Sequence, residues 1–257
     1  MGANNQGTTW QNGDTMKTIL VVGIGTGSAE HMTIAAIEAL NRADVLFIPE
    51  KGAGKSDLAD IRRGIVTRFV RGAEPRQIGY AVPRREVQDP QYERSVADWH
   101  QSLADIYAVL ISDVPDNGTG AFLVWGDPGL YDSTLRILER VEEPIRVEVI
   151  PGITAIQALT AAHGIALNRI GEPVLITPAR KLGPIETDTI VMLDGQMAFR
   201  DADPDLEIFW GAYLGTPDEI LVAGRLGDVA DRIVNMRTIA RQRHGWIMDT
   251  YLLRKPE

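Results

Sequence analysis

The chain has 257 residues, of which 44% are hydrophobic and 24% charged, and its formal net charge is −9 at pH 7. This length suits one large domain or two smaller ones, and the composition is that of a globular protein. The acidic balance argues against a general nucleic-acid-binding protein, and the apolar runs are far shorter than the roughly 20 residues that cross a bilayer. We therefore expect neither a nucleic-acid nor a membrane partner.

Two residue types narrow the chemistry further. The chain has no Cys, which excludes disulfides, thiolate zinc sites and a Cys nucleophile. Its four His residues are scattered without the paired spacing of metal ligands, so we expect no metal site. Residues 1–15 are polar and lack the apolar core of a signal peptide, which predicts a disordered leader and a cytoplasmic protein.

The first part of the chain alternates apolar runs with amphipathic stretches. The expected strands are Thr18–Val22, Val45–Pro49, Phe122–Trp125 and Arg146–Ile150. The expected helices are Glu30–Leu40, Ser56–Phe69, Tyr92–Ile111 and Ile153–Ala162. This alternation predicts an α/β domain with a parallel, doubly wound sheet over residues 16–168.

The stretch GAFLVWGDPGLYDS, Gly120–Ser133, is the most informative part of that domain. Its apolar run ends at Gly126-Asp127-Pro128-Gly129, and a helical pattern follows. Such a strand, turn and helix are typical of a ligand crevice at the carboxyl end of a parallel strand. An ordinary β–α turn that happens to carry an Asp is the alternative.

A boundary is expected near Gly171-Glu172-Pro173, after which the pattern changes. The expected strands there are Val174–Thr177, Thr189–Leu193, Leu206–Leu214 and Ile247–Leu253. The expected helices are Thr216–Leu221 and Asp228–Arg241. The pattern predicts a smaller mixed α+β domain over residues 169–257.

A glycine-rich turn, Gly23–Ser28, follows the first expected strand. Its context is that of a dinucleotide-binding turn, with Glu50 as a candidate ribose ligand, but Ser28 stands where the third glycine of that fingerprint belongs. A nicotinamide-dependent oxidoreductase therefore stays open as an alternative.

Positive charge is concentrated between Lys51 and Arg85, where nine basic residues face three acidic ones. A basic segment in an acidic protein indicates a local anionic ligand. A solvated helix face is an equally good explanation, because four of the arginines lie within one helical stretch.

Five motifs, in this order, resemble the tetrapyrrole methylase family. They are GIGTGSAEHMT (Gly23–Thr33), GDPGLYDS (Gly126–Ser133), PGITA (Pro151–Ala155), TIVMLDG (Thr189–Gly195) and GTPDEI (Gly215–Ile220). The resemblance covers the chain after Met16 and implies the two-domain fold of that family. Within the family, KGAGKSDLADIRR (Lys51–Arg63) and VADWHQ (Val96–Gln101) are most similar to the member that methylates precorrin-5 and releases acetate during cobalamin biosynthesis.

The resemblance implies an enzyme that binds S-adenosylmethionine, folded, in the cleft between two domains and leaves S-adenosylhomocysteine as product. Carried over motif by motif, the implied cofactor contacts are Thr26, Trp125, Gly126, Asp127, Leu130, Thr154, Ala155, Asp194 and Leu214. Thr26 and Asp194 depart from the family pattern, which has Pro and often Met there.

Precorrins carry many carboxylates, and Arg pairs bidentately with carboxylates. We therefore expect the substrate to contact Lys55, Arg62, Arg63, Arg84 and Arg85. Loss of an acetyl group requires water and general acid–base help, for which the candidates are Tyr131, Asp132 and His100.

Two further expectations concern assembly and alternatives. The family is usually homodimeric, so we expect a homodimer. A methyltransferase of the same family that acts on another precorrin, or on a protein or RNA, also stays open, although the acidic charge disfavours RNA. A binding module without catalysis is disfavoured by the number of ligand-type turns.

Overall fold

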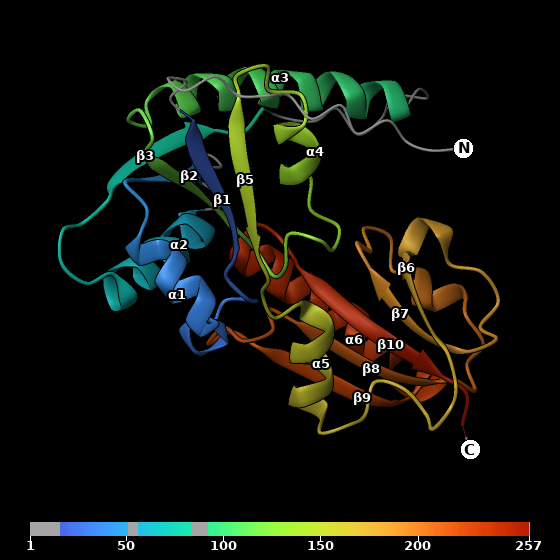
Figure 1. Ribbon diagram of the computed structural model, residues 1–257. Coiled ribbons are helices and arrows are strands. Elements are labelled where there is room, and N and C mark those ends of the chain that lie inside the picture. Colours follow the sequence, from blue (N-terminus) through green and yellow to red (C-terminus); the bar gives the residue numbers. More distant parts are fainter. Residues whose placement is uncertain (1–15, 51–55, 84–91, 257) are drawn as a thin grey trace.

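The computed structural model describes residues 16–50, 56–83 and 92–256, and its first half is built on a parallel sheet (Figure 1). Five strands run in the order β3-β2-β4-β1-β5, and every neighbouring pair is parallel. Their bounds are β1 Lys17–Gly23, β2 Val45–Glu50, β3 Arg76–Ala81, β4 Thr119–Val124 and β5 Ile145–Ile150. This confirms the expected parallel sheet.

Both faces of that sheet are covered, because side chains alternate along each strand. Leu20 and Val22 of β1 pack into the core beneath α1 and α2, whereas Ile19 and Val21 pack into the core beneath α3 and α4. Figure 1 shows α1 and α2 on one side of the sheet and α3 on the other. The helices span α1 Ile34–Asn41, α2 Ser56–Phe69, α3 Tyr92–Ser112 and α4 Thr134–Leu138, with a 3₁₀ turn, η1, at Ala29–His31.

The second half is built on a mixed sheet in the order β6-β7-β10-β8-β9, in which only β6 and β7 are parallel. Its strands are β6 Val174–Pro178, β7 Asp188–Met192, β8 Glu207–Ala212, β9 Ile220–Arg225 and β10 Asp249–Arg254. Helix α5, Ala155–His163, covers one face, and α6, Leu226–His244, covers the other. Two 3₁₀ turns, η2 Ala179–Lys181 and η3 Ala198–Asp201, precede β7 and β8 respectively. Because α5 packs on this sheet although it precedes residue 169, the division into 16–168 and 169–257 stays a prediction.

Three expected elements differ from the structure. The expected helix Thr216–Leu221 is wrong: Glu219 N donates to Thr216 O in a turn, and β9 begins at Ile220. The expected helix Glu30–Leu40 is divided, because the Thr33 hydroxyl accepts from Ala36 N and caps a new helix, α1. Strand β3 was not expected, since it is an exposed edge strand with one neighbour.

Among the described residues, no helix is both long enough and apolar enough to cross a membrane. Within the same part of the chain, no group of three or more His, Cys, Asp or Glu side chains is placed to hold a metal ion.

Candidate functional site

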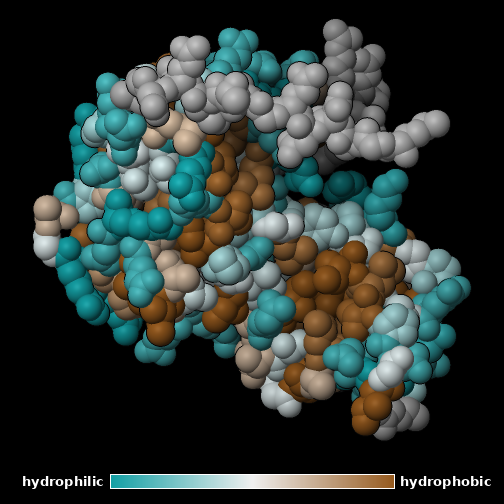
Figure 2. All heavy atoms as spheres, in the orientation of Figure 1, coloured by the Kyte–Doolittle hydropathy of each residue, from teal (hydrophilic) through white to brown (hydrophobic). Residues whose placement is uncertain are grey.

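A cavity of about 610 Å³ is lined by residues from both halves of the chain. The first half contributes the loops after β4 and β5 and parts of α2, β3 and α3, while the second half contributes the segments after β7 and around the start of β10. Figure 2 shows apolar side chains gathered on each of the two halves. The volume lies within the range of about 300–1,000 Å³ that is usual for small-molecule sites.

The loops that follow β1, β4 and β5 meet backbone to backbone. Gly25 and Gly126 form an isolated bridge, in which Gly126 N donates to Gly25 O at 2.8 Å. A Cβ placed on Gly23 would lie 2.6 Å from Gly152 N and 2.8 Å from Gly126 O. These glycines are therefore used for close packing between loops of this chain.

That packing removes the basis for the nicotinamide alternative. A Cβ on Gly27 would meet the Thr216 side chain, so the protein itself fills the space beside this loop. Glu50, the candidate ribose ligand, accepts from Arg63 at 2.8 Å. The glycine-rich turn and Glu50, the two features of the expected dinucleotide site, therefore both contact other parts of this protein.

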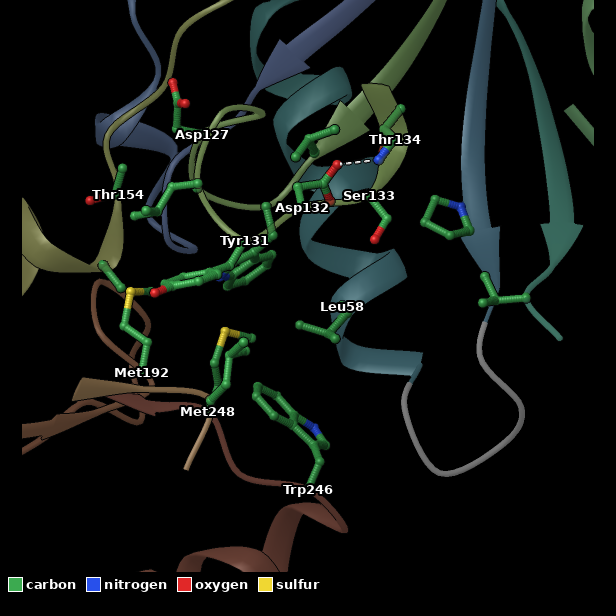
Figure 3. Close-up of a pocket in the computed structure, with 18 of the residues that line it drawn as sticks. Leu58, Asp127, Tyr131, Asp132, Ser133, Thr134, Thr154, Met192, Trp246 and Met248 are labelled. Atoms are coloured by element: carbon green, nitrogen blue, oxygen red, sulfur yellow. Dashed lines mark hydrogen bonds between the residues drawn. The ribbon is translucent and has the colours of Figure 1, made fainter. Parts of the chain in front are cut away.

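Asp127 ties two of these loops together. One carboxylate oxygen accepts from Gly129 N at 2.7 Å, and the other accepts from Gly152 N at 2.8 Å. The first bond closes a tight turn after β4, and the second joins that turn to the loop after β5. The turns that carry Asp127 and Thr154 thus lie side by side at the cavity (Figure 3).

Thr154 and Ala155 begin helix α5. The Thr154 hydroxyl accepts from Ile156 N at 3.1 Å and also contacts the Gln157 side chain, which completes a capping box. Both residues line the cavity.

A second cavity of about 20 Å³ adjoins the main one. It is lined by Thr26 and Leu214, and it shares a set of lining residues with the main cavity: Trp125, Ala155, Trp246, Met248 and Thr250. All nine expected cofactor positions therefore line one of two adjoining cavities. In Figure 3, Met192, Met248 and Trp246 approach from the second half, opposite Asp127 and Thr154.

Asp194 lines the main cavity, but its carboxylate is occupied by the protein. One oxygen accepts from the amides of Gln196 and Met197, and the other accepts from Ala198 N and from the Tyr251 hydroxyl, at 2.7–2.9 Å. Asp194 is 4% exposed. Its carboxylate therefore shapes the loop after β7, where Leu193 adopts a φ of 56°.

Behind that loop lies a buried ion pair. Arg237 Nε donates to Asp249 at 2.9 Å, and Trp210 Nε1 donates to the same carboxylate oxygen at 2.9 Å. Arg237 also donates to the carbonyl of Asp194. Burial raises the pKa of Asp249, and the hydrogen bond and charge of Arg237 oppose that rise.

Two of the five basic residues expected to bind substrate, Arg62 and Arg63, are described by the structure, and of these Arg62 lines the cavity. It is 8% exposed, whereas Arg63 lies on the outer side of α2 and pairs with Glu50 and Asp60. Arg63 does not line the cavity, and its guanidinium is engaged by two carboxylates of the protein, so the structure gives no support to a substrate contact there. Lys55, Arg84 and Arg85 lie outside the described residues.

Two of the three candidates for acid–base chemistry line the cavity. Tyr131 and Asp132 are adjacent in the loop between β4 and α4, and Asp132 accepts from Thr134 N at 2.7 Å (Figure 3). The Tyr131 hydroxyl reaches the carbonyl of Ile176 in β6 at 3.5 Å. His100 is buried on α3 and does not line the cavity, so its expected catalytic role is not supported.

Several lining residues were not anticipated. They are Tyr80 on β3, Tyr107 on α3, Arg241 on α6, and Trp246 and Met248 before β10. No local sequence motif marks a single aromatic or basic residue at a strand end or on a helix face as part of a cavity. The three-residue spacing of Leu103 and Ile106 in α3 could have placed Tyr107 near the buried side.

Comparison with known proteins agrees with this architecture. Residues 18–230 match the family of tetrapyrrole (corrin/porphyrin) methylases. The chain is 54% identical, over 93% of its length and 96% of the relative's, to precorrin-6A synthase [deacetylating] from Sinorhizobium sp.

Solved structures give the same result. A putative cobalamin synthesis related protein (CobF) from Corynebacterium diphtheriae superimposes with a TM-score of 0.80 at 41% identity, covering 94% of this chain and all of that one. Uroporphyrin-III C-methyl transferase from Thermus thermophilus, complexed with S-adenyl homocysteine, shares the fold at 19% identity and a TM-score of 0.57, over 92% of this chain and 97% of its own. The chain belongs to the tetrapyrrole methylase family.

Proposed function

We propose that this protein is an S-adenosylmethionine-dependent C-methyltransferase that converts precorrin-5 to precorrin-6A with release of acetate, in cobalamin biosynthesis. The observation that carries this proposal is the similarity to precorrin-6A synthase [deacetylating], 54% identical over nearly the full length of both chains. The shared cavity agrees with it, because it brings strand-end loops of both halves to one site whose volume is usual for a small-molecule site.

S-adenosylmethionine supplies a methyl group on a sulfonium, which a nucleophilic ring carbon can attack directly. The lining residues suit such a donor, since they offer backbone groups, aromatic rings and thioethers. We assign cofactor binding to the nine positions named above, with Asp127 and Asp194 acting by holding their loops in place. Positioning two reactants in line can lower a barrier by roughly 7–11 kcal/mol, so no strong base is required for methyl transfer.

Three of the arginines that the structure describes line the cavity. Arg237 is paired with Asp249, Arg62 is buried in the cavity wall, and Arg241 lies at an exposed position on α6. Among the described residues, Arg241 has no recorded hydrogen bond or ion pair, so its guanidinium is available for a substrate carboxylate. We infer that Arg241 joins Arg62 in binding the acidic side chains of the precorrin.

We further infer that the enzyme is a cytoplasmic homodimer. The cosubstrate is made and used in the cytoplasm, which supports the location. Exposed apolar residues on two edge strands, Val147 and Val149 on β5 and Leu175 and Ile176 on β6, support association with a second copy. Light scattering coupled to size-exclusion chromatography measures this state directly.

The decisive experiment incubates the purified protein with precorrin-5 and methyl-labelled S-adenosylmethionine. We expect labelled corrinoid product and free acetate in equal amounts. Label transfer without acetate, or transfer to a different precorrin only, would contradict the proposal.

A matched pair of variants tests the cofactor site. Ala155 lines both cavities, whereas Ala162 is exposed on the same helix. Ala155→Leu should weaken S-adenosylhomocysteine binding about tenfold or more by filling the space between the cavities, and Ala162→Leu should leave it unchanged. Isothermal titration measures both affinities, and the rise of Tm with S-adenosylhomocysteine but not with NADH provides an independent check.

A further inference from the structure

One end of the cavity contains a polar cluster within otherwise apolar walls. Its members come from four separate elements: Arg62 from α2, Tyr80 from β3, Tyr107 from α3, and Asp132 from the loop before α4. We call these four residues the polar cluster. Because they converge from distant parts of the chain on one cavity, a ligand can contact all four.

Arg62 is a buried cation without a carboxylate partner among the described residues. Its Nε donates to Leu123 O at 3.0 Å, and one terminal nitrogen donates to Leu58 O at 2.9 Å. The guanidinium lies 6.0 Å from the centre of the Trp125 ring. Burying a charge is costly unless it is paired, so this arrangement favours an anionic ligand, or a ligand that becomes anionic during the reaction.

The two tyrosines add neutral hydrogen-bond donors. Their hydroxyl oxygens are 3.5 Å apart, and the Tyr107 ring stacks on Phe122 at 4.2 Å. Burial raises the pKa of both phenols. Both therefore keep their protons near neutral pH. One hydroxyl donates to the other, which leaves one phenolic hydrogen of the pair for an oxygen placed in the cavity.

Asp132 supplies an acceptor in the same cluster. Its Oδ1 accepts from Thr134 N at 2.7 Å, which fixes the carboxylate (Figure 3), while Oδ2 has no recorded partner among the described residues. No ion pair joins Asp132 to Arg62, although burial lowers the pKa of Arg62 and the charge of Asp132 opposes that lowering. Both residues line the cavity, so a water held by Oδ2 would lie in the same cavity as the guanidinium and the hydroxyls.

We propose that the polar cluster is the deacetylation subsite of the enzyme, with Asp132 as general base for water and with Arg62 and the hydrogen-bonded pair of Tyr80 and Tyr107 as donors to the acetyl oxygen, one tyrosine hydroxyl donating to that oxygen and the other supporting it. This inference rests on the proposed function. The observation behind it is that one cavity is lined by a carboxylate with a free oxygen, a buried cation and a pair of neutral hydroxyls, which are the groups that a general base and an oxyanion site require.

The reaction balances without any further reactant. Asp132 takes a proton from water, and the hydroxide oxygen adds to the acetyl carbon as the carbonyl electron pair moves to oxygen, where Arg62 and the tyrosines stabilise it. The oxyanion collapses, the bond between the acetyl carbon and the macrocycle breaks, and its electron pair stays on the macrocycle. That carbon then attacks the sulfonium methyl. Acetic acid and Asp132 release their protons to solvent.

The test measures acetate release and methyl transfer separately in the wild type and three variants. We expect Asp132→Asn, Tyr107→Phe and Arg62→Lys each to slow acetate release about 10²-fold, the usual effect of losing a base or one oxyanion donor. S-adenosylhomocysteine affinity should change less than twofold. Arg68→Lys, on the exposed side of the same helix, is the control and should behave as wild type.

A second readout separates catalysis from structure. Sodium acetate should inhibit the wild type by occupying the polar cluster, and its inhibition constant should rise about tenfold in Tyr80→Phe and Arg62→Lys. In Tyr107→Phe the ring can still stack on Phe122, so this variant should fold and can test the subsite even if Arg62→Lys does not fold. Wild-type acetate release in both Asp132→Asn and Tyr107→Phe would overturn this inference alone, whereas no acetate from the wild type would overturn the proposed function.

Discussion

The two halves of the chain hold their loops at the shared cavity by different means. In the first half, glycines let the loops after β1, β4 and β5 touch through their backbones, and one carboxylate, Asp127, joins two of them. In the second half, the loop after β7 is held by buried charged side chains: the carboxylate of Asp194, and Arg237, which pairs with Asp249 and donates to the carbonyl of Asp194. The loops of the first half approach closely mainly because glycines have no side chain, whereas the loop of the second half is held by buried charged groups.

The largest effect is expected from breaking the ion pair of the second half. Arg237→Met should lower the free energy of unfolding by about 3–5 kcal/mol, because it leaves the Asp249 carboxylate buried without its partner. Arg241→Met, one turn further along α6 and exposed, should change it by less than about 0.5 kcal/mol. Urea unfolding measures both, and equal effects of the two changes would show that the pair is not what holds this loop.

The corresponding change in the first half adds one carbon. A Cβ on Gly152 would lie 2.8 Å from Gly23 Cα and also meet Gly126 O, and all of these atoms are backbone. Gly152→Ala should therefore cost about 3 kcal/mol of stability through overpacking. Gly183→Ala, with nothing within 4 Å of the added carbon, is the control. Thermal unfolding compares them, and an unchanged Gly152→Ala protein would contradict the backbone packing.

A smaller effect is expected at the charged link between loops of the first half. Asp127→Asn should cost about 1–2 kcal/mol, because an amide cannot accept from both Gly129 N and Gly152 N with the strength of a carboxylate. Binding of S-adenosylhomocysteine should weaken in parallel, as the two loops separate. The exposed Asp116→Asn variant should match the wild type in both measurements. Weakened stability with unchanged binding would limit Asp127 to a structural role.

The smallest effect is expected from a buried tyrosine of the second half at high pH. Burial raises the pKa of Tyr213 from 10.0 to about 12, and its hydroxyl donates to Trp246 O at 2.6 Å. The unfolded phenol ionises first, so the stabilisation from Tyr213 is complete below pH 10 and is lost between pH 10 and 12. The stability difference between wild type and Tyr213→Phe should therefore shrink across that interval. A constant difference in urea unfolding from pH 9 to 12 would contradict the raised pKa.

The comparison also explains what could be predicted from the sequence. A turn such as Gly126–Gly129 is determined by its own glycine, proline and aspartate residues, so the sequence predicts both the turn and the parallel strands around it. Strand β3 is a short, largely exposed edge strand in which only Ile78 and Tyr80 alternate toward the core, and so short a pattern could not place Tyr80. Contacts made by residues far apart in the chain leave no local pattern.

Arg62 and Asp194 illustrate the limit more finely. The spacing of Arg62 places it on the same helix face as Leu58 and Ile65, which distinguishes it from Arg63. Its burial could not be predicted, because arginine is rarely buried unless it is paired with an acidic residue. The family pattern places Asp194 beside a cofactor, whereas its carboxylate accepts from three amides and from Tyr251, 57 residues away. The sequence thus predicts that Asp194 lies at the cavity, but it does not predict that the Asp194 carboxylate holds its own loop.

The tryptophans described in this fold give the enzyme an internal optical signal. Trp99, Trp125 and Trp246 line the main cavity, whereas Trp210 is enclosed in the core of the second half. A molecule that enters the cavity displaces water from three indole rings and leaves the fourth in unchanged surroundings. Emission intensity and colour should thus follow occupancy in real time, and a stopped-flow trace can time cosubstrate and macrocycle arrival without any added dye.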